Sequence, residues 1–461
     1  MTSATRLEMN RAVPPGPKGH WLRGSIREFA RDRLGFLDEN FRSYGDVVAF
    51  RLGPYRIVQV NHPDLIEDVV VTRNRSFIKH FALKQTKTTL GKGLLTSEGD
   101  FWRRQRKLAQ PAFHRDRIAG YADVMVRYGE RMLNSWADGQ VRDVQDDMMR
   151  LTLEIVAKTL FDAEMAGEAA DASAAMDTLM RCFTARLNSP VKLPEWVPTP
   201  VNLRLRRSIA RLDRIIFRFI AERRASNEER DDLLSMLLNA RDEDDSRMTD
   251  RQLRDELMTL FMAGHETTAN TLAWAFWLIA LNPEAETRLH AELDEVLNGR
   301  APTCADLPRL PFTGHVVTET LRLYPTVWLI GREAIEPVRV GDYQLNRGTT
   351  VYMSQWVVHR DPRWYDDPLS YRPERWEDGL AKRLPRYAYF PFGGGPRLCI
   401  GNNFALMEAT LLIATIARRF RLRLAADATV TPLPTMTLRP DHGIKMIVEE
   451  RCKGQSPVAA R

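Results

Sequence analysis

Apolar positions at helical spacing dominate the middle of the chain. From about Phe101 to Leu297 they predict a series of amphipathic helices. The longest helix is expected at Asp250–Leu281, because Thr249 and Gln252 form a capping-box pattern before it and Asn282-Pro283 ends it. About 32 residues at a rise of ~1.5 Å each make a rod roughly 48 Å long, enough to cross a whole domain.

Runs of alternating or continuous apolar residues predict a smaller β portion. Val47–Leu52 and Tyr55–Val60 flank Gly53-Pro54, which is typical of a β-hairpin. Further strands are expected at Val338–Val340 and Thr350–Met353. The expected fold class is therefore mainly α with a minor β portion.

A proline-rich segment from Asn188 to Arg207 interrupts the helical pattern. Its prolines, at positions 190, 194, 198 and 200, are incompatible with one continuous helix, since proline lacks the amide that a helix interior needs. Trp196 and Val197 in this segment either touch a ligand or a membrane surface or only pin the loop.

Composition narrows the class of protein only slightly. A chain of 461 residues would ordinarily suggest two or three domains, but no linker or internal repeat divides it. The net charge of +7 is too modest to suggest nucleic acid. Residues 1–22 contain charges and no long apolar run, so we expect neither a signal peptide nor a membrane anchor. The cysteines lack metal-site or disulfide-scaffold spacing, which suits a reducing compartment; they are Cys182, Cys304, Cys399 and Cys452.

Cys399 lies in a glycine-rich stretch, Pro391–Gly401, directly before a helix expected at Asn402–Phe420. Glycines let the backbone approach something bulky and flat, because no Cβ intervenes. A thiolate near a helix N-terminus is favoured by the helix dipole. An anionic sulfur on such a loop is what axial ligation of a haem iron requires. The alternative is a buried structural cysteine.

Five motifs resemble, in order, the signatures of the cytochrome P450 superfamily. Phe392, Gly395, Arg397, Cys399 and Gly401 match its haem-binding loop at every position. The other motifs are Trp102-Arg-Arg-Gln-Arg106, Ala263-Gly-His-Glu-Thr-Thr268, Glu319-Thr-Leu-Arg322 and Pro373-Glu-Arg-Trp376. Similar flanking patterns extend from about Pro14 to Glu450, and chance agreement of all five motifs is negligible.

The resemblance implies one large domain at residues 14–450, after a flexible segment at 1–13 and before a loose tail at 451–461. It implies haem b (iron protoporphyrin IX) between the long central helix and the cysteine loop, with the Cys399 thiolate as axial ligand. The proline-rich segment would be the lid over the substrate entrance. Pro14-Pro-Gly-Pro17 is similar to the hinge after the anchor of membrane-bound relatives. Because residues 1–13 are mostly polar, we expect a soluble, bacterial-type, cytoplasmic member.

The resemblance also assigns contacts to the haem. Trp102 and Arg106, one helical turn apart, and Arg397 are expected to bind its propionates, whereas Arg332 either does so or forms a surface salt bridge. The remaining haem contacts are expected from Phe392, Gly401, Ala263 and Gly264.

Glu266 and Thr267 are an acid and an alcohol in the middle of an apolar helix. In the family this pair delivers protons to bound oxygen, which makes both residues candidate catalytic groups. The alternative is a solvent-facing Glu266 and a Thr267 whose hydroxyl bonds its own helix backbone. His265 is expected to be a neighbour rather than a ligand.

Glu319 and Arg322 lie three residues apart on one helical face, and Arg375 would complete an ion network that holds the haem loop. The candidate substrate contacts are apolar for the most part, and an ordinary core explains them equally well; they are Leu94, Leu95, Thr268, Val327 and Leu329. Arg103, Arg104 and Lys107 either dock an acidic electron donor or form a solvated face.

The sequence therefore predicts a monooxygenase that inserts one oxygen atom from O2 into a lipophilic substrate of the fatty acid, terpenoid or steroid class. Too few residues follow Cys399 for a flavin reductase domain, so a separate ferredoxin or flavodoxin with its reductase is expected, and the protein is expected to be a monomer. One alternative is an O2-independent isomerase or dehydratase, which Glu266 and Thr267 disfavour. The other is a haem-based sensor or binding protein without turnover.

Overall fold

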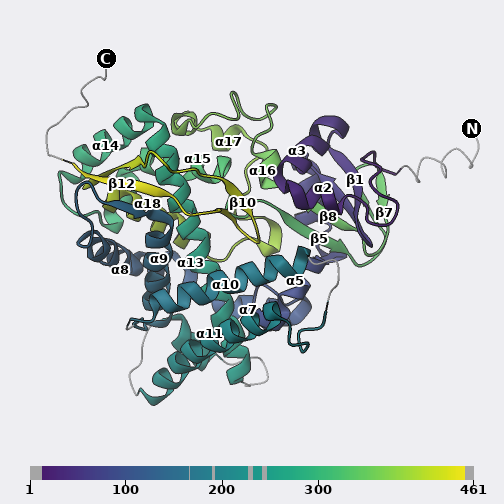
Figure 1. Ribbon diagram of the computed structural model, residues 1–461, viewed down its shortest axis with the longest axis horizontal. Helices are drawn as coiled ribbons and strands as arrows, with labels where there is room; N and C mark the ends of the chain where they lie inside the picture. Colours follow the sequence, from purple (N-terminus) through teal and green to yellow (C-terminus); the bar gives the residue numbers. More distant parts are fainter. Residues whose placement is uncertain (1–12, 166, 189–192, 227–231, 241–246, 452–461) are drawn as a thin grey trace, which may run out of the picture. The chain divides into compact units, whose positions relative to one another are not determined.

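The computed structural model describes residues 13–165, 167–188, 193–226, 232–240 and 247–451 (Figure 1). The chain divides into two compact units, each made of segments distant in sequence. The β-rich unit comprises Met1–Gln85, Arg322–Ser370 and Asp378–Cys399. The helical unit comprises Thr86–Leu321, Tyr371–Glu377 and Ile400–Arg461. The predicted segment 1–13 and tail 451–461 lie almost wholly outside the described residues.

A five-stranded sheet of order β1-β2-β8-β5-β3 forms the core of the β-rich unit. Its first two strands are the predicted hairpin, with Leu52 opposite Tyr55 and Gly53 in the left-handed region at φ +61°. The sheet strands are β1 (Val47–Leu52), β2 (Tyr55–Val60), β3 (Phe77–Lys79), β5 (Ile330–Ala334) and β8 (Thr350–Met353). A second hairpin joins β6 (Val338–Val340) to β7 (Tyr343–Leu345), so both later strands that the sequence predicts are confirmed.

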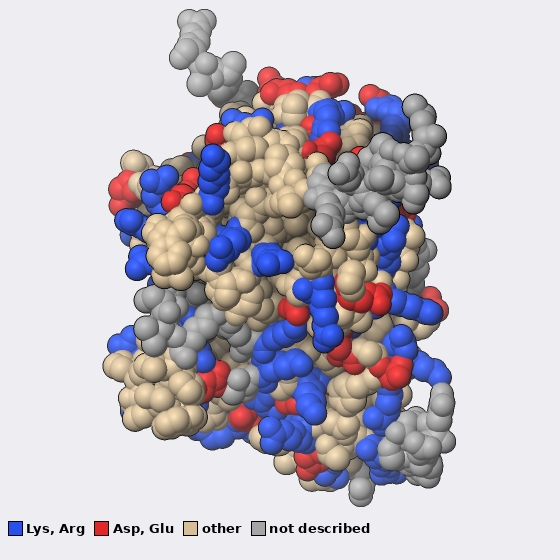
Figure 2. All heavy atoms as spheres, turned by 90° about the vertical axis from the view of Figure 1, so that its right-hand side faces the viewer, with Lys and Arg blue, Asp and Glu red and all other residues tan. Residues whose placement is uncertain are grey.

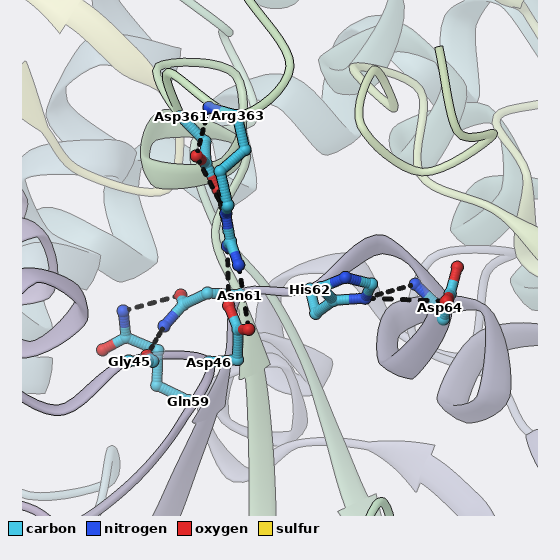
Figure 3. Close-up of polar contacts among 8 residues, drawn as sticks. All are labelled: Gly45, Asp46, Gln59, Asn61, His62, Asp64, Asp361 and Arg363. Carbon is cyan, nitrogen blue, oxygen red and sulfur yellow. Dashed lines mark hydrogen bonds and ion pairs between the residues drawn. The ribbon is translucent and has the colours of Figure 1, made fainter.

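The helices of the β-rich unit are mostly short, namely α2 (Ile26–Arg31), α3 (Arg33–Tyr44), α4 (Pro63–Glu67), η1 (Asp68–Thr72), η2 (Asn74–Ser76), α5 (Phe81–Gln85), α16 (Gln355–Val358), α17 (Leu380–Arg383) and η6 (Gly395–Arg397). A polar cluster ties the base of the hairpin to the segment after α16 (Figure 3). In it, Arg363 bridges Asp46 and Asp361 at 2.6 Å each, and Asn61 Nδ2 donates to the carbonyl of Gly45 at 2.9 Å. Both ends of the hairpin are thereby fixed.

The helical unit is organised around the central helix α13 (Asp250–Leu281), which has the predicted bounds. Its capping box is confirmed, because the Gln252 amide N–H donates to Thr249 Oγ1 at 3.3 Å and the Thr249 N–H donates to Gln252 Oε1 at 2.8 Å. The helix packs mainly against α9 (Val144–Phe161). A Cβ on Gly264 would lie 3.0 Å from Val156 Cγ2, so glycine lets these two helices approach closely.

The other elements of the helical unit are α6 (Lys87–Leu90), α7 (Gly99–Ala109), η3 (Gln110–Phe113), α8 (Arg115–Leu133), α10 (Ala169–Asn188), α11 (Pro200–Ala225), α12 (Leu233–Asn239), α14 (Pro283–Leu297), η4 (Cys304–Arg309), η5 (Pro373–Trp376) and α18 (Asn402–Ala417). Helix α15 (Pro311–Leu323) belongs to the helical unit up to Leu321, and its last two residues belong to the β-rich unit. Two small sheets contain β4 (Val141–Asp143), β9 (Phe420–Leu424), β12 (Lys445–Glu450), β10 (Pro432–Pro434) and β11 (Leu438–Pro440).

Two predicted boundaries are wrong. Helix α11 begins at Pro200, so the interruption expected to reach Arg207 is shorter; Pro190 lies outside the described residues. Proline is tolerated in the first helical turn, and Thr199 Oγ1 caps the helix by accepting from the Asn202 N–H at 3.1 Å. Helix α18 ends at Ala417, because the chain turns into β9 at Phe420.

Charged side chains of both signs are interspersed on the face shown in Figure 2, where blue basic atoms cover more area than red acidic ones. This agrees with the net charge of +7. Within the described part of the chain, the helices fall short of the length and apolar character that a membrane span requires.

Candidate active site

The cysteine loop of the β-rich unit is shaped by glycines that no other residue could replace without movement. Gly395 has φ +61°, and a Cβ there would lie 1.9 Å from the carbonyl oxygen of Val70. A Cβ on Gly394 would lie 2.3 Å from the ring of Tyr387, whose hydroxyl accepts from the Gly395 N–H at 3.2 Å. The loop is therefore packed tightly onto its own unit.

Cys399 ends this loop and is exposed, so the alternative of a buried structural cysteine is wrong. Its N–H donates to the carbonyl of Phe392 at 3.0 Å, which fixes the backbone that carries the sulfur. The neighbouring Leu398 has 38% of its surface exposed. An accessible thiol with an apolar neighbour, on a loop held firmly by its own unit, fits an apolar group ligated through sulfur.

Gly401 is explained less well by packing. A Cβ at this position would meet only the ring of Phe113, at 3.6 Å, which is an ordinary contact. Its φ of −96° is also accessible to any residue. Protein packing alone therefore does not require glycine there.

Other predicted residues of the β-rich unit are partly accessible. Phe392 and Arg397 are half-buried on the cysteine loop. Arg332 is half-buried on β5, where its Nη1 donates to the carbonyl of Gly331 at 3.0 Å. Val327 and Leu329 are half-buried and alternate with the buried Trp328, so both keep a partly accessible surface.

In the helical unit, Trp102 and Arg106 on α7 line the same cavity of about 350 Å³. The rest of its lining is mostly basic or polar and consists of Arg103, Lys107, Gln110, Pro111 and His114. An indole N–H and several cations around one cavity suit a carboxylate, since charge-assisted hydrogen bonds are the stronger kind. Trp102 and Arg106 thus fit the predicted role of binding a propionate.

Helix α13 carries a strip of accessible small residues in an otherwise buried middle. Ala263 is exposed, and Gly264 and Thr267 are half-buried. The Thr267 hydroxyl donates to the carbonyl of Ala263 at 2.7 Å, so the back-bonded alternative describes Thr267 correctly in this structure. A hydroxyl in such a position can rotate between its helix and a neighbouring group.

Glu266 is buried, so the solvent-facing alternative is wrong for this residue. Its Oε1 accepts from the Thr437 hydroxyl at 2.6 Å. Burial raises the pKa of Glu266, whereas the Thr437 hydrogen bond and the nearby Arg439 lower it. The predicted acid is therefore buried with one hydroxyl donor, which the sequence did not indicate because Thr437 lies far along the chain.

Two other buried ionisable side chains flank this region. Burial lowers the pKa of His265 to about 4, so its imidazole is neutral, in agreement with the expected role as a packed neighbour. Thr268 is buried and donates to the carbonyl of Gly264 at 3.2 Å. Burial raises the pKa of Glu408 on α18 to about 8, and the nearby Thr268 hydroxyl opposes this rise. Sequence reasoning did not single out Glu408.

The three residues of the predicted ion network belong to different units, Glu319 and Arg375 to the helical unit and Arg322 to the β-rich unit. In the helical unit, Glu319 is fully buried and accepts from Arg375 Nε, the Arg372 N–H and Trp376 Nε1 at 2.9, 3.0 and 2.9 Å. The predicted pair of Glu319 and Arg375 is present. In the β-rich unit, Arg322 is fully buried and donates to the carbonyls of His359, Pro368 and Ser370. Its pairing with Glu319 stays a prediction.

The remaining predicted residues of the helical unit lie in the α6–α7 loop, in the proline-rich segment and on α7. Leu94 is buried and Leu95 half-buried in the loop between α6 and α7. In the proline-rich segment Trp196 is 76% exposed, whereas the carbonyl of Val197 accepts from Asn202 Nδ2 at 2.9 Å, so Val197 helps to pin the loop. Arg103 and Lys107 are exposed on α7 and Arg104 is half-buried.

A mainly α fold, an accessible cysteine on a glycine-rich loop and a cavity lined by cations are each typical of proteins of the haem-thiolate class. The sequence profile of the Cytochrome P450 family matches residues 14–448. The chain therefore belongs to the cytochrome P450 family.

Several characterised relatives are similar over nearly their whole length. Cyclooctatin synthase of Streptomyces melanosporofaciens is 40% identical over 438 residues, which cover 94% of this chain and 95% of that protein. Cyclooctat-9-en-7-ol 5-monooxygenase of the same organism is 38% identical over 425 residues, covering 90% and 89%. Pentalenene oxygenase of Streptomyces avermitilis is 35% identical over 434 residues, covering 94% and 96%.

Membership fixes the cofactor and the kind of enzyme. The protein is a cytochrome P450 monooxygenase whose cofactor is haem b, bound through a cysteine thiolate as axial ligand. The family also implies a redox partner and a lipophilic substrate. The residues described above are chemically suited to this cofactor, because Cys399 is accessible and the cavity on α7 is lined by an indole and by cations.

Proposed function

We propose that this enzyme inserts one oxygen atom from O2 into a carbon–hydrogen bond of a cyclic terpenoid. The cysteine loop, with its accessible Cys399, is the observation that carries the monooxygenase chemistry. The substrate class is supported by the names of three relatives, which refer to cyclooctatin, cyclooctat-9-en-7-ol and pentalenene. Of the three lipophilic classes that the sequence left open, the terpenoids fit these names best.

Cys399 would hold the haem iron, and the bound haem supplies the activation of O2. Trp102 and Arg106 would bind one propionate in the cavity on α7. Arg397 and Arg332 are the candidate partners of the other carboxylate, and each is half-buried and carries a permanent charge. Phe392, Gly401, Ala263 and Gly264 would contact the ring.

Glu266 and Thr267 would control proton delivery. Glu266 is held at Oε1 by the Thr437 hydroxyl, and burial raises the pKa of Glu266, so its carboxyl binds a proton more readily than an exposed one. Thr267 donates to the carbonyl of Ala263 at rest, and rotation of its hydroxyl would pass a proton to the accessible strip of α13. General acid–base groups of this kind contribute about 10²–10⁴-fold to rates.

Apolar side chains would hold the substrate, namely Leu94, Leu95, Val327 and Leu329, with Thr268 beside them. The electron donor would be a ferredoxin or flavodoxin with its reductase. The exposed Arg103 and Lys107 support this assignment, because an acidic donor would be steered toward them. A monomeric cytoplasmic enzyme is the simplest state consistent with this scheme.

Reduction of the purified protein under carbon monoxide tests the ligand assignment. The wild type should give the long-wavelength Soret band of a thiolate-ligated haem, and Cys399→Ser should lose that band. Incubation with cyclic terpenes, a ferredoxin, its reductase and NADPH should then give hydroxylated products that carry oxygen from ¹⁸O2. Products formed equally well without O2 would instead favour an isomerase or dehydratase, and no product from any substrate would favour a sensor or binding protein.

A further inference from the structure

Consecutive charged residues on α13 bind the backbone of the loop that carries Leu94 and Leu95. Asp255 Oδ2 accepts from the Lys92 N–H at 2.8 Å, and Glu256 Oε2 accepts from the Leu94 N–H at 2.8 Å. Both side chains are buried, with 6% and 2% of their residue surface exposed. Since the donors are backbone amides, these two hydrogen bonds do not depend on which side chains the loop carries.

Glycines bring the loop directly onto the helix. A Cβ on Gly91, which has φ +61°, would lie 1.9 Å from Asp255 Cγ, and a Cβ on Gly93 would lie 2.1 Å from Thr259 Oγ1. Thr96 closes the loop on itself, because its hydroxyl donates to the carbonyl of Gly91 at 2.6 Å. The loop therefore has one close-fitting position on α13.

Arg254 extends the same cluster to a second element. Its Nη1 donates to the carbonyl of Thr89 at 2.9 Å and its Nε donates to Asp213 Oδ1 on α11 at 2.7 Å. Nη1 also donates to Asp255 Oδ1 at 3.0 Å, which orients that carboxylate. Charge-assisted hydrogen bonds away from water are about twice as strong as neutral ones, so the cluster gives the loop a rigid base.

We propose that Asp255 and Glu256 are positioning residues that determine the regioselectivity of oxidation, because they fix Leu94 and Leu95 against the substrate. The proposal rests on the proposed function for the presence of a terpenoid in the pocket. A rigid loop holds the substrate in one orientation and so determines which carbon–hydrogen bond reacts. Small displacements of bound groups change reaction rates strongly.

The test compares the holoenzyme with its Asp255→Asn and Glu256→Gln variants. The matched control is Asp250→Asn, which removes a carboxylate of the same helix whose side chain is 54% exposed in a surface pair with Arg224. Amide hydrogen exchange of Lys92 and Leu94 should become about tenfold faster in the two variants, as expected for one weakened hydrogen bond, and stay unchanged in the control. Exchange within α13 should stay unchanged in all of them.

Two functional readouts complete the test. With a terpene substrate, the ratio of hydroxylated products should change by about tenfold in the two variants. The dissociation constant of 4-phenylimidazole, read from the shift of the Soret band, should also change, and this probe needs no turnover. Gly93→Ala displaces the same loop by a change in the loop itself. It should alter the product ratio and the azole affinity in the same direction as the Asp255→Asn and Glu256→Gln variants do.

Unchanged exchange at Lys92 and Leu94 would overturn the inference, and so would faster exchange with an unaltered azole affinity. Should the enzyme oxidise no terpene at all, the proposed function fails, but exchange and azole binding still decide the positioning role. Exchange that rises uniformly over the whole protein would indicate general destabilisation and would also contradict the inference.

Discussion

Two buried acidic side chains of the helical unit, Glu266 and Glu408, differ in their hydrogen-bond partners. Glu266 accepts a hydrogen bond from the Thr437 hydroxyl, whereas the carboxyl oxygens of Glu408 have no hydrogen-bond partner among the residues that the structure describes. Burial raises the pKa of both carboxyl groups, since a charged form is disfavoured away from water. Both are therefore able to hold a proton at pH values where an exposed glutamate is ionised, and each can be tested at the level of one residue.

Thr437→Val should impair proton delivery while leaving the fold intact. The variant removes the hydroxyl that donates to Glu266 Oε1, so the pKa of Glu266 should rise further. We expect product per NADPH to fall by about tenfold, and the carbonyl stretch of protonated Glu266 to persist to higher pH in infrared spectra. The control is Thr159→Val, which removes a buried hydroxyl that bonds only within α9. An unchanged infrared titration would rule out this role for Thr437.

Glu408→Gln should change how stability depends on pH. Burial raises the pKa of Glu408 from the ordinary 4.5 to about 8, so the folded protein binds a proton that the unfolded chain releases between these values. The free energy of unfolding of the wild type should therefore decrease as pH rises from about 4.5 to about 8. The variant should lose this component and gain relative stability from pH 5 to pH 8, measured by urea unfolding. The control is Glu222→Gln, an exposed site. Parallel wild-type and variant curves would contradict the shifted pKa.

At the scale of elements, boundaries were predicted correctly where the residues that determine them are neighbours in the sequence. The β1–β2 hairpin and α13 have the predicted bounds, because a Gly-Pro turn and a capping box lie next to them in sequence. The start of α11 was missed because proline is permitted in a first turn, and its cap depends on Thr199. Candidate site residues inside the family motifs could be predicted from the sequence by resemblance. Thr437, Glu408 and Asp255 could not be predicted, because their roles come from contacts between distant parts of the chain.

The cysteine loop gives a prediction at this scale. Gly395→Ala should displace the loop, because the new Cβ would lie 1.9 Å from the carbonyl of Val70 and φ is +61°. We expect a lower haem content per polypeptide and a weaker long-wavelength Soret band under carbon monoxide. The matched control is Gly120→Ala on α8, where nothing lies within 4 Å and alanine should stabilise the helix by about 0.5–1 kcal/mol. Full haem content in Gly395→Ala would mean that the loop can relax without cost to the site.

At the scale of the whole molecule, the chain passes between its two units several times. One segment of the β-rich unit runs from Arg322 to Ser370, and its two ends are joined directly, because the Arg322 guanidinium donates to the carbonyl of Ser370 at 3.0 Å. The same group also donates to the carbonyls of His359 and Pro368 at 2.9 and 2.6 Å. A buried cation therefore joins the two ends of this segment of the β-rich unit.

Arg322→Ala should consequently yield protein without bound haem. The variant removes the donor of one buried and two partly buried hydrogen bonds, and each buried group left unsatisfied costs about 1–3 kcal/mol, so the β-rich unit should lose much of its stability. The matched control is Arg372→Ala, whose side chain is 45% exposed and pairs with Glu374 at the surface, where an ion pair contributes at most about 1 kcal/mol. Haem content and the midpoint of thermal unfolding measure the difference. A normally coloured, active Arg322→Ala enzyme would show that the segment closes without this cation.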